Sequence, residues 1–221
     1  MTGGPARSEV ILRVWTRSIL IAIVVWLFLR TFVVEAVRIP SGSMEGTLLV
    51  GDFLFVRKAF YSPHRGDLIV FRSVEEPGRK LVKRVIGLPG DTLAMQAGTV
   101  IRNGAALAEP YAVSADPARS ESPENRARMR RWQLPEYAGP DPEGYRPDLH
   151  DWGPVVVPPD SLFVMGDNRD DSYDSRYWGF VPRGNVRGRP VIIYFSREPD
   201  SWNALPWLSR VRWARIFSLP E

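Results

Sequence analysis

The chain has 221 residues, 44% of them hydrophobic, which is enough for one sizeable core. It contains no cysteine, which excludes disulfides and thiolate metal sites, and its two histidines, His64 and His150, leave little room for a histidine metal cluster. The net charge of +4 comes from basic residues scattered among acidic ones, with no basic stripe. We therefore expect no nucleic-acid partner.

The first predicted element is an apolar run at residues 18–29. A helix of that length spans about 18 Å, whereas a helix over residues 14–34 spans about 31 Å and matches the hydrocarbon core of a bilayer. A cleaved secretory signal is the alternative, but no A-x-A pattern follows the run. Arginines before it favour a cytoplasmic N-terminus. We therefore expect a cytoplasmic tail at residues 1–13, a transmembrane anchor at 14–34 and an extracytoplasmic domain at 35–221.

Short segments rich in β-branched and aromatic residues follow the anchor, and Gly, Pro, Asn or Asp bounds most of them. They lie at residues 52–56, 67–71, 81–86, 99–102, 161–165 and 191–195. This part of the sequence has no long apolar period of 3.6 residues. The pattern predicts a β domain built from short strands.

Residues 115–159 differ from the rest, because a segment of mixed charge leads into one rich in Pro, Gly and Asp. We interpret this stretch as a largely irregular surface insertion, with a short helix around residues 123–132. His150 lies inside it, so we do not expect that histidine to be catalytic.

Two serines flank a glycine in the stretch RIPSGSMEGTL, just beyond the expected anchor. In the simplest interpretation, Ser41 and Ser43 are helix-capping or turn residues. A serine hydroxyl becomes a good nucleophile only when a neighbouring base takes its proton. Without a convincing histidine, the candidate bases are carboxylates and lysines.

One lysine has an unusual setting, in the predicted strand of LVKRVIGLPGD. Alternation places Leu81, Lys83 and Val85 on one face of that strand. If this face is buried, the pKa of Lys83 falls and its neutral amine can act as a general base. From alternation alone, the simpler interpretation is an edge-strand lysine that discourages aggregation.

A third polar stretch, MGDNRDDSYDSRYWGFVP, covers residues 165–182. Its Gly, Asp, Asn and Ser content is typical of a tight loop whose side chains bind nearby backbone. Asp174 and Arg176 could form an ion pair that braces the loop. A metal-binding loop is the alternative, although the calcium-loop spacing with its terminal glutamate is absent.

Together, five motifs resemble those of bacterial type I signal peptidases: PSGSM, GDFLFV, RGDLIVF, KRVIGLPGD and GDNRDDSYDSRYWGFVP, in this order behind an apolar N-terminal segment. The resemblance covers most of residues 15–197 apart from the insertion. It implies a mainly β fold, with an antiparallel catalytic domain behind one transmembrane helix. It also implies a serine endopeptidase with a Ser/Lys dyad and no metal or organic cofactor.

By position in these motifs, Ser43 corresponds to the nucleophile and Lys83 to its general base. Ser41 corresponds to the residue whose hydroxyl forms the oxyanion hole with the backbone N–H of Ser43. Ser172 matches the serine that orients the lysine. The resemblance further assigns Asp174 and Arg176 to a supporting ion pair beside the site.

The resemblance also implies a substrate, a location and partners. The substrates are secretory precursors, cut after small residues in an Ala-X-Ala pattern, and we expect Ile39, Met44 and Val82 to line the shallow pockets for those residues. The enzyme would lie in the bacterial cytoplasmic membrane, in contact with lipid, with its catalytic domain on the outer side. One departure is Gly46, which stands where the family usually has proline, and glycine would relax the nucleophile segment.

Three alternatives remain open from the sequence. A specialised Ser/Lys processing peptidase of a conjugation or pilus system would share the motifs. A self-cleaving regulator would also use serine and lysine, but the expected anchor argues against it. A catalytically silent, membrane-tethered binding protein belongs to a different class, and the intact Ser43, Lys83 and Ser172 argue against it.

Overall fold

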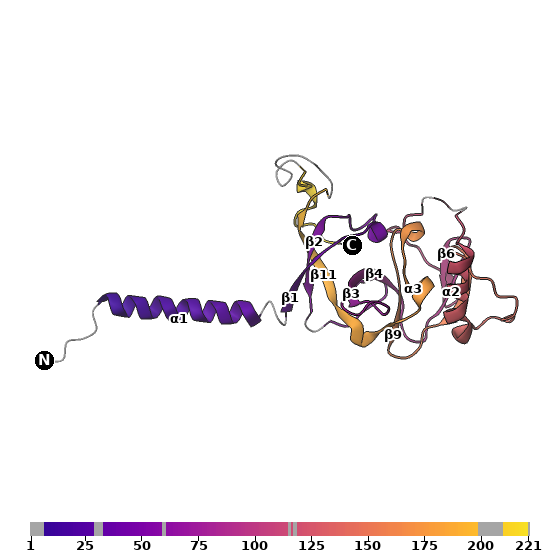
Figure 1. Ribbon diagram of the computed structural model, residues 1–221, viewed down its shortest axis with the longest axis horizontal. Coiled ribbons are helices and arrows are strands. Elements are labelled where there is room, and N and C mark those ends of the chain that lie inside the picture. The colour runs from indigo at the N-terminus through magenta and orange to yellow at the C-terminus, as the bar shows by residue number, and fades with distance from the viewer. Residues whose placement is uncertain are drawn as a thin grey trace.

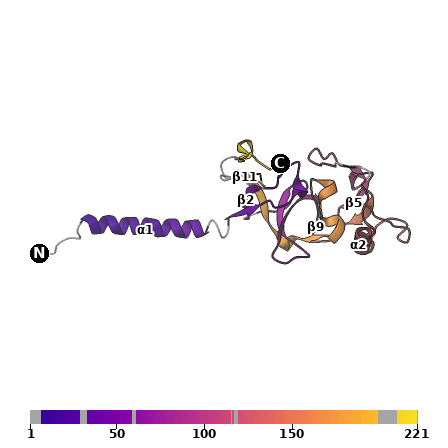
Figure 2. The ribbon, with the colours of Figure 1, turned by 45° about the horizontal axis from the view of Figure 1, so that its top comes forward.

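A long helix and a β-rich body make up the computed structural model (Figure 1). The structure describes residues 7–28, 33–58, 61–114, 116, 119–198 and 210–220. Helix α1 (Arg7–Phe28) stands clear of the β-rich body in both views (Figures 1 and 2). In the described ranges, no helix combines the length and the apolar character that a membrane crossing requires. Residues 1–6 of the expected tail and 29–32 of the expected anchor lie outside these ranges.

Seven strands form the larger sheet, and every neighbouring pair is antiparallel, in the order β1–β2–β11–β3–β4–β9–β10. The strands are β1 (Val34–Arg38), β2 (Asp52–Arg57), β3 (Leu68–Arg72), β4 (Lys80–Gly87), β9 (Ser161–Met165), β10 (Val181–Pro182) and β11 (Val186–Ser196). Five of the predicted strands are confirmed here, as β2, β3, β4, β9 and β11. The mainly β, antiparallel architecture expected from the sequence is therefore present.

A second antiparallel sheet has four strands in the order β7–β6–β5–β8. These strands are β5 (Thr92–Gln96), β6 (Thr99–Arg102), β7 (Ala105–Ala106) and β8 (Trp152–Val156). Only β6 was expected from the sequence. Strand β5 reads TLAMQ and β8 reads WGPVV, so neither has the run of β-branched and aromatic residues that marks a strand. One hydrophobic core, which includes Leu93, Val155 and Phe163, joins the two sheets.

The interpretation of residues 115–159 as an irregular surface insertion is wrong for much of this segment. It contains β8 and helix α2 (Pro123–Gln133), which confirms the short helix predicted there. Met129, Leu149 and Trp152 are buried in the core against Phe163. Single apolar residues between prolines and charges give no periodic signal, but the packing of these side chains orders the chain.

The segment is also attached to the loop that follows β9. His150 is buried, and its Nε2 lies 2.9 Å from Oδ1 of Asp170. Ser114 donates a hydrogen bond to the same carboxylate at 3.0 Å. Further along the same loop, the backbone oxygen of Arg176 accepts a hydrogen bond from Nε1 of Trp132 in α2 at 2.9 Å. Through these contacts the insertion supports the polar loop identified in the sequence.

Candidate active site

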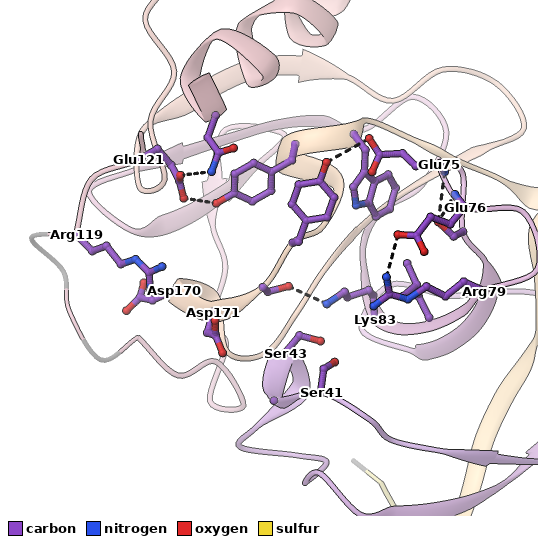
Figure 3. Close-up of a pocket in the computed structure, with 18 residues that line it drawn as sticks. Ser41, Ser43, Glu75, Glu76, Arg79, Lys83, Arg119, Glu121, Asp170 and Asp171 are labelled. Carbon is purple, nitrogen blue, oxygen red and sulfur yellow. Dashed lines mark hydrogen bonds and ion pairs between the residues drawn. The ribbon is translucent and has the colours of Figure 1, made fainter. Parts of the chain in front are cut away.

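The predicted catalytic residues meet at a cavity of about 370 Å³ (Figure 3). It opens where the segment before β2, the middle of β4 and the loop after β9 come together. Ser41, Ser43, Lys83 and Ser172 all line it. Residues more than a hundred positions apart in the chain are thus brought into one site by the pairing of β4 with β3 and β9.

Ser43 lies in a single 3₁₀ turn, Gly42–Met44, whose third residue is buried in the core. Asn168, in the loop after β9, holds this turn with two hydrogen bonds. Its backbone N donates to the backbone oxygen of Ser43 at 3.2 Å, and its Nδ2 donates to the backbone oxygen of Gly42 at 3.2 Å. Gly166 permits this approach, because a Cβ there would lie 2.3 Å from the Ser43 oxygen and 2.2 Å from Ser172 Oγ. Ser43 therefore lies in a short segment whose backbone is fixed by hydrogen bonds from Asn168.

Lys83 lies on an interior strand and is only 3% exposed. Its neighbour in β3 is Ile69, and β9 pairs with β4 from Arg84 onward. The interpretation as an edge-strand lysine is therefore wrong, since β4 has a partner on each side and the side chain is buried. Burial lowers the pKa of Lys83 to about 8, although the nearby Asp174 opposes this effect. About a tenth of the side chain is consequently a neutral amine at one pH unit below that pKa, far more than for an ordinary lysine.

Ser172 fixes the direction in which the Lys83 amine points. Lys83 Nζ donates to Ser172 Oγ at 2.9 Å, and Ser172 Oγ donates to Asp174 Oδ2 at 2.7 Å (Figure 3 shows the first of these bonds). Because the Ser172 proton is committed to the carboxylate, Ser172 can only accept from the amine. The lone pair of neutral Lys83 is therefore left for another proton donor, and Ser43 lines the same cavity.

Asp174 and Arg176 form an ion pair that is fully buried. Arg176 donates from Nε to Asp174 Oδ1 at 2.9 Å and from Nη2 to Oδ2 at 2.9 Å. The backbone N of Gly166 donates to the same carboxylate at 3.0 Å. Burial by itself would raise the pKa of Asp174, but Arg176 outweighs this effect and holds the pKa below its usual value. The carboxylate that orients Ser172 is thus ionised.

Sequence reasoning missed a second buried ion pair, between Arg84 and Asp167. Arg84 donates from Nε and Nη2 to the two Asp167 oxygens at 2.8 and 2.7 Å. Thr47, four residues after Ser43, donates to Asp167 at 2.6 Å. Through these contacts, the ion pair connects β4, the segment around Ser43 and Thr47, and the loop after β9. The signal was available, since both residues belong to quoted motifs, Arg84 within β4 and Asp167 just after β9.

The alternative of a metal-binding loop gains no support from this geometry. Asp167 is bound by Arg84, Asp170 by His150 and Asp174 by Arg176. Across the described ranges, no group of three or more His, Asp and Glu side chains is arranged to hold a metal ion. These three carboxylates are partners of basic side chains.

The three residues expected to line substrate pockets are not part of the wall of this cavity. Ile39 and Met44 are buried, and Val82 packs against them in a cluster that includes Leu48 and Leu54. None of the three is among the residues that line the cavity of Figure 3. Val82 follows the alternation of β4 and points away from the face of Lys83. Their contact with substrate stays a prediction.

Gly46 has a conformation that explains its presence in place of proline. Its φ is +105°, whereas proline is restricted to a φ near −65°. A Cβ at this position would also lie 2.9 Å from Val113 and 3.0 Å from the backbone oxygen of Tyr111. The segment that follows Ser43 therefore requires glycine at this position, and the segment after β7 packs against it.

A serine beside a buried lysine of lowered pKa is typical of serine hydrolases that use lysine in place of histidine as the base. The model of the signal peptidase family, peptidase S26, matches residues 12–195. A signal peptidase I of Leptolyngbya laminosa is 40% identical over 189 residues, which cover 81% of this chain and 77% of that protein. A signal peptidase I of Pseudomonas aeruginosa is 33% identical over 236 residues, covering 92% and 80%.

The crystal structure of a signal peptidase I from Enterococcus faecalis is 28% identical, covers 59% of this chain and 98% of that one, and has a TM-score of 0.39. From the family match and the relatives, this chain belongs to the signal peptidase family, peptidase S26, and is a serine endopeptidase of the bacterial type I kind.

Proposed function

We propose that this protein removes N-terminal signal peptides from secretory precursors, with Ser43 as the nucleophile and Lys83 as the general base. The observation that carries the proposal is the chain of hydrogen bonds from Lys83 to Ser172 to Asp174, which leaves the lysine lone pair free at the cavity that holds Ser43. The names of the relatives, signal peptidase I, supply the substrate class.

In acylation, neutral Lys83 takes the proton of Ser43 Oγ as that oxygen attacks the carbonyl carbon of the cut bond. The negative charge that develops on the carbonyl oxygen is stabilised by the backbone N–H of Ser43 and the hydroxyl of Ser41. As the C–N bond breaks, protonated Lys83 returns its proton to the leaving nitrogen. The signal peptide is then joined to Ser43 as an ester, and Lys83 is again neutral.

In deacylation, neutral Lys83 takes a proton from water while the water oxygen attacks the ester carbon. The proton then returns to Ser43 Oγ as the ester C–O bond breaks, which releases the signal peptide as a carboxylic acid, and this acid ionises by losing its remaining proton to the solvent. Asp174, held by Arg176, keeps Ser172 oriented through both half-reactions. Lys83, Ser172 and Asp174 therefore act in both half-reactions, and the enzyme returns to its starting state.

We further propose that residues 14–34 attach the enzyme to the bacterial cytoplasmic membrane, with residues 1–13 in the cytoplasm and the catalytic domain on the outer side. Support comes from the arginines that precede the apolar run. Large apolar side chains of α1, such as Trp15 and Leu20, are 65% and 63% exposed, and an apolar surface of this kind needs a partner that is not water. Such an attachment would place Ser43 close to the outer membrane surface, where precursors emerge.

The proposal is tested by incubating the detergent-solubilised protein with a secretory precursor and sequencing the new N-terminus. We expect a single cut after an Ala-X-Ala sequence. A matched precursor with phenylalanine in place of the alanine before the cut should remain intact. Cleavage at unrelated positions, or equal cleavage of both precursors, would contradict the proposed specificity.

The pH dependence of cleavage follows from the state of Lys83. The lysine is active when neutral, and its pKa is lowered to about 8 by burial. We therefore expect kcat/KM to rise about tenfold per pH unit well below that value and to level off above it, because only the deprotonated fraction reacts. The measurement is kcat/KM from about pH 6 to pH 9.5. A flat profile over this range, with the fold intact, would contradict lysine as the base.

A further inference from the structure

The cavity extends beyond Lys83 to a wall that is rich in carboxylates (Figure 3). Two stretches outside the five motifs contribute to it, namely the turn between β3 and β4 and the chain leading into α2. We name as the acidic wall four carboxylates of the cavity lining: those of Glu75 and Glu76, beyond Lys83, and those of Glu121 and Asp171, on the other side of the cavity (Figure 3). With Asp170, five carboxylates of the described residues line the cavity, together with the guanidinium groups of Arg79 and Arg119. A third guanidinium, that of Arg128, forms an ion pair with Glu75 at 3.2 Å. When Lys83 is neutral, the cavity carries a net negative charge.

Neutral donors hold two of these carboxylates in place. Glu75 accepts a hydrogen bond from the Tyr173 hydroxyl at 3.2 Å, in addition to its contact with Arg128, and Glu121 accepts one from the Tyr177 hydroxyl. Burial raises the pKa of Tyr173, and the carboxylate of Glu75 acts in the same direction. Both tyrosines are neutral donors and do not offset the charge of either carboxylate, although the guanidinium of Arg128 offsets part of the charge of Glu75.

The other two carboxylates are open to the solvent in the cavity. Glu76 accepts a hydrogen bond from Arg79 at 2.9 Å, but both side chains are more than half exposed. Asp171 is exposed, and it lies near enough to Lys83 to act on its charge. Exposed ion pairs contribute little stability, so Arg79 does not hold Glu76 firmly, and the carboxylates of the lining outnumber its guanidinium groups. A peptide in the cavity would therefore meet a negative potential.

The chemistry of the site determines which part of the substrate enters this region. In the proposed reaction, the acyl half stays on Ser43, whereas the leaving nitrogen must lie at Lys83 Nζ to receive its proton. The residues after the cut bond therefore continue beyond Lys83. Leu81, two positions before Lys83 on the same face of β4, lines this part of the cavity. The wall with Glu75 and Glu76 lies on the far side of Lys83 from Ser43 in Figure 3.

We propose that the acidic wall selects precursors by the charge of the first residues after the cut. Lysine or arginine in the first few positions of the released chain is favoured, and aspartate or glutamate is disfavoured. This inference rests on the proposed function and adds a second determinant to the small residues before the cut. It also gives the segment at residues 115–159 a role, because that segment supplies Glu121 and orders the chain around it.

The test uses three precursor peptides with the same signal sequence and Lys-Lys, Ala-Ala or Glu-Glu at the second and third positions after the cut. At low salt, we expect kcat/KM to decrease in that order, with about a tenfold difference between the first and the last, since two partly screened charges are involved. In about 0.5 M NaCl the difference should shrink to about twofold, because the Debye length falls to a few ångströms.

A variant carrying Glu76→Gln and Asp171→Asn should reduce the low-salt ratio between the Lys-Lys and Glu-Glu peptides to about twofold. The matched control is Glu143→Gln, which removes the charge of an exposed residue that does not line the cavity and should retain the full ratio. Equal kcat/KM for the three peptides, all cut at the expected bond, would overturn this inference while the proposed function stands. If none of the peptides is cut, the proposed function fails and this inference fails with it.

Discussion

Replacing Lys83 by arginine is expected to abolish cleavage, with a loss of about 10⁴-fold or more in kcat/KM, as for removal of the base in other serine hydrolases. Arginine remains protonated in proteins, so it offers no lone pair to Ser43. Lysine at this position is different because burial brings its pKa to about 8. The measurement is kcat/KM at about pH 8, with circular dichroism to establish that the variant is folded.

The same strand offers a matched control. Lys80 lies three residues before Lys83 on β4, is 42% exposed at its side chain and binds Glu35. Lys80→Arg keeps this exposed ion pair and should change kcat/KM by less than about twofold. Since a buried guanidinium could disturb the fold, Lys83→Met provides an uncharged variant of similar length, and it should be equally inactive. Cleavage near the wild-type rate by either Lys83 variant would exclude the lysine mechanism.

The strands of the larger sheet were predictable because their sequences carry a local signal. Segments such as 67–71 and 81–86 combine β-branched and apolar residues between Gly, Pro and Asp, and each became a strand within one or two residues of the predicted bounds. Strands β5 and β8 were missed, since Leu, Ala, Met and Gln dominate β5 and a Gly-Pro pair interrupts β8. They are stabilised by the core that they share with the larger sheet, and this packing has no local signature.

For the site, the sequence identified the residues but not their environment. Alternation on β4 suggested that Lys83 could be buried, yet only the neighbouring strands decide whether a strand is interior or at an edge. The link from Lys83 to Ser172 joins residues 89 positions apart, and the bond from Asn168 to Gly42 joins residues 126 positions apart. Contacts of this kind depend on topology, which is why the roles came from motif resemblance and the geometry came from the structure.

Replacing Asp174 by asparagine is expected to destabilise the protein by about 3–5 kcal/mol, because it leaves the guanidinium of Arg176 buried without a counter-ion. The measurement is the free energy of unfolding in guanidinium chloride. As a control, Glu198→Gln breaks an exposed ion pair with Arg210 and should cost less than about 1 kcal/mol. A loss below about 1 kcal/mol for Asp174→Asn would show that the buried pair does not stabilise the loop.

The same substitution has a catalytic signature that a purely structural role would not produce. Asp174 favours the charged form of Lys83, so its neutralisation should lower the pKa of Lys83 below about 8 and shift the rise of kcat/KM to lower pH. Cleavage should nevertheless be slower at every pH, because Ser172 loses the acceptor that fixes its proton. Adding Arg176→Met to Asp174→Asn removes the uncompensated charge and should recover part of the stability but not the rate. Stability and orientation of the lysine are thus separate contributions of one carboxylate, and the double variant distinguishes them.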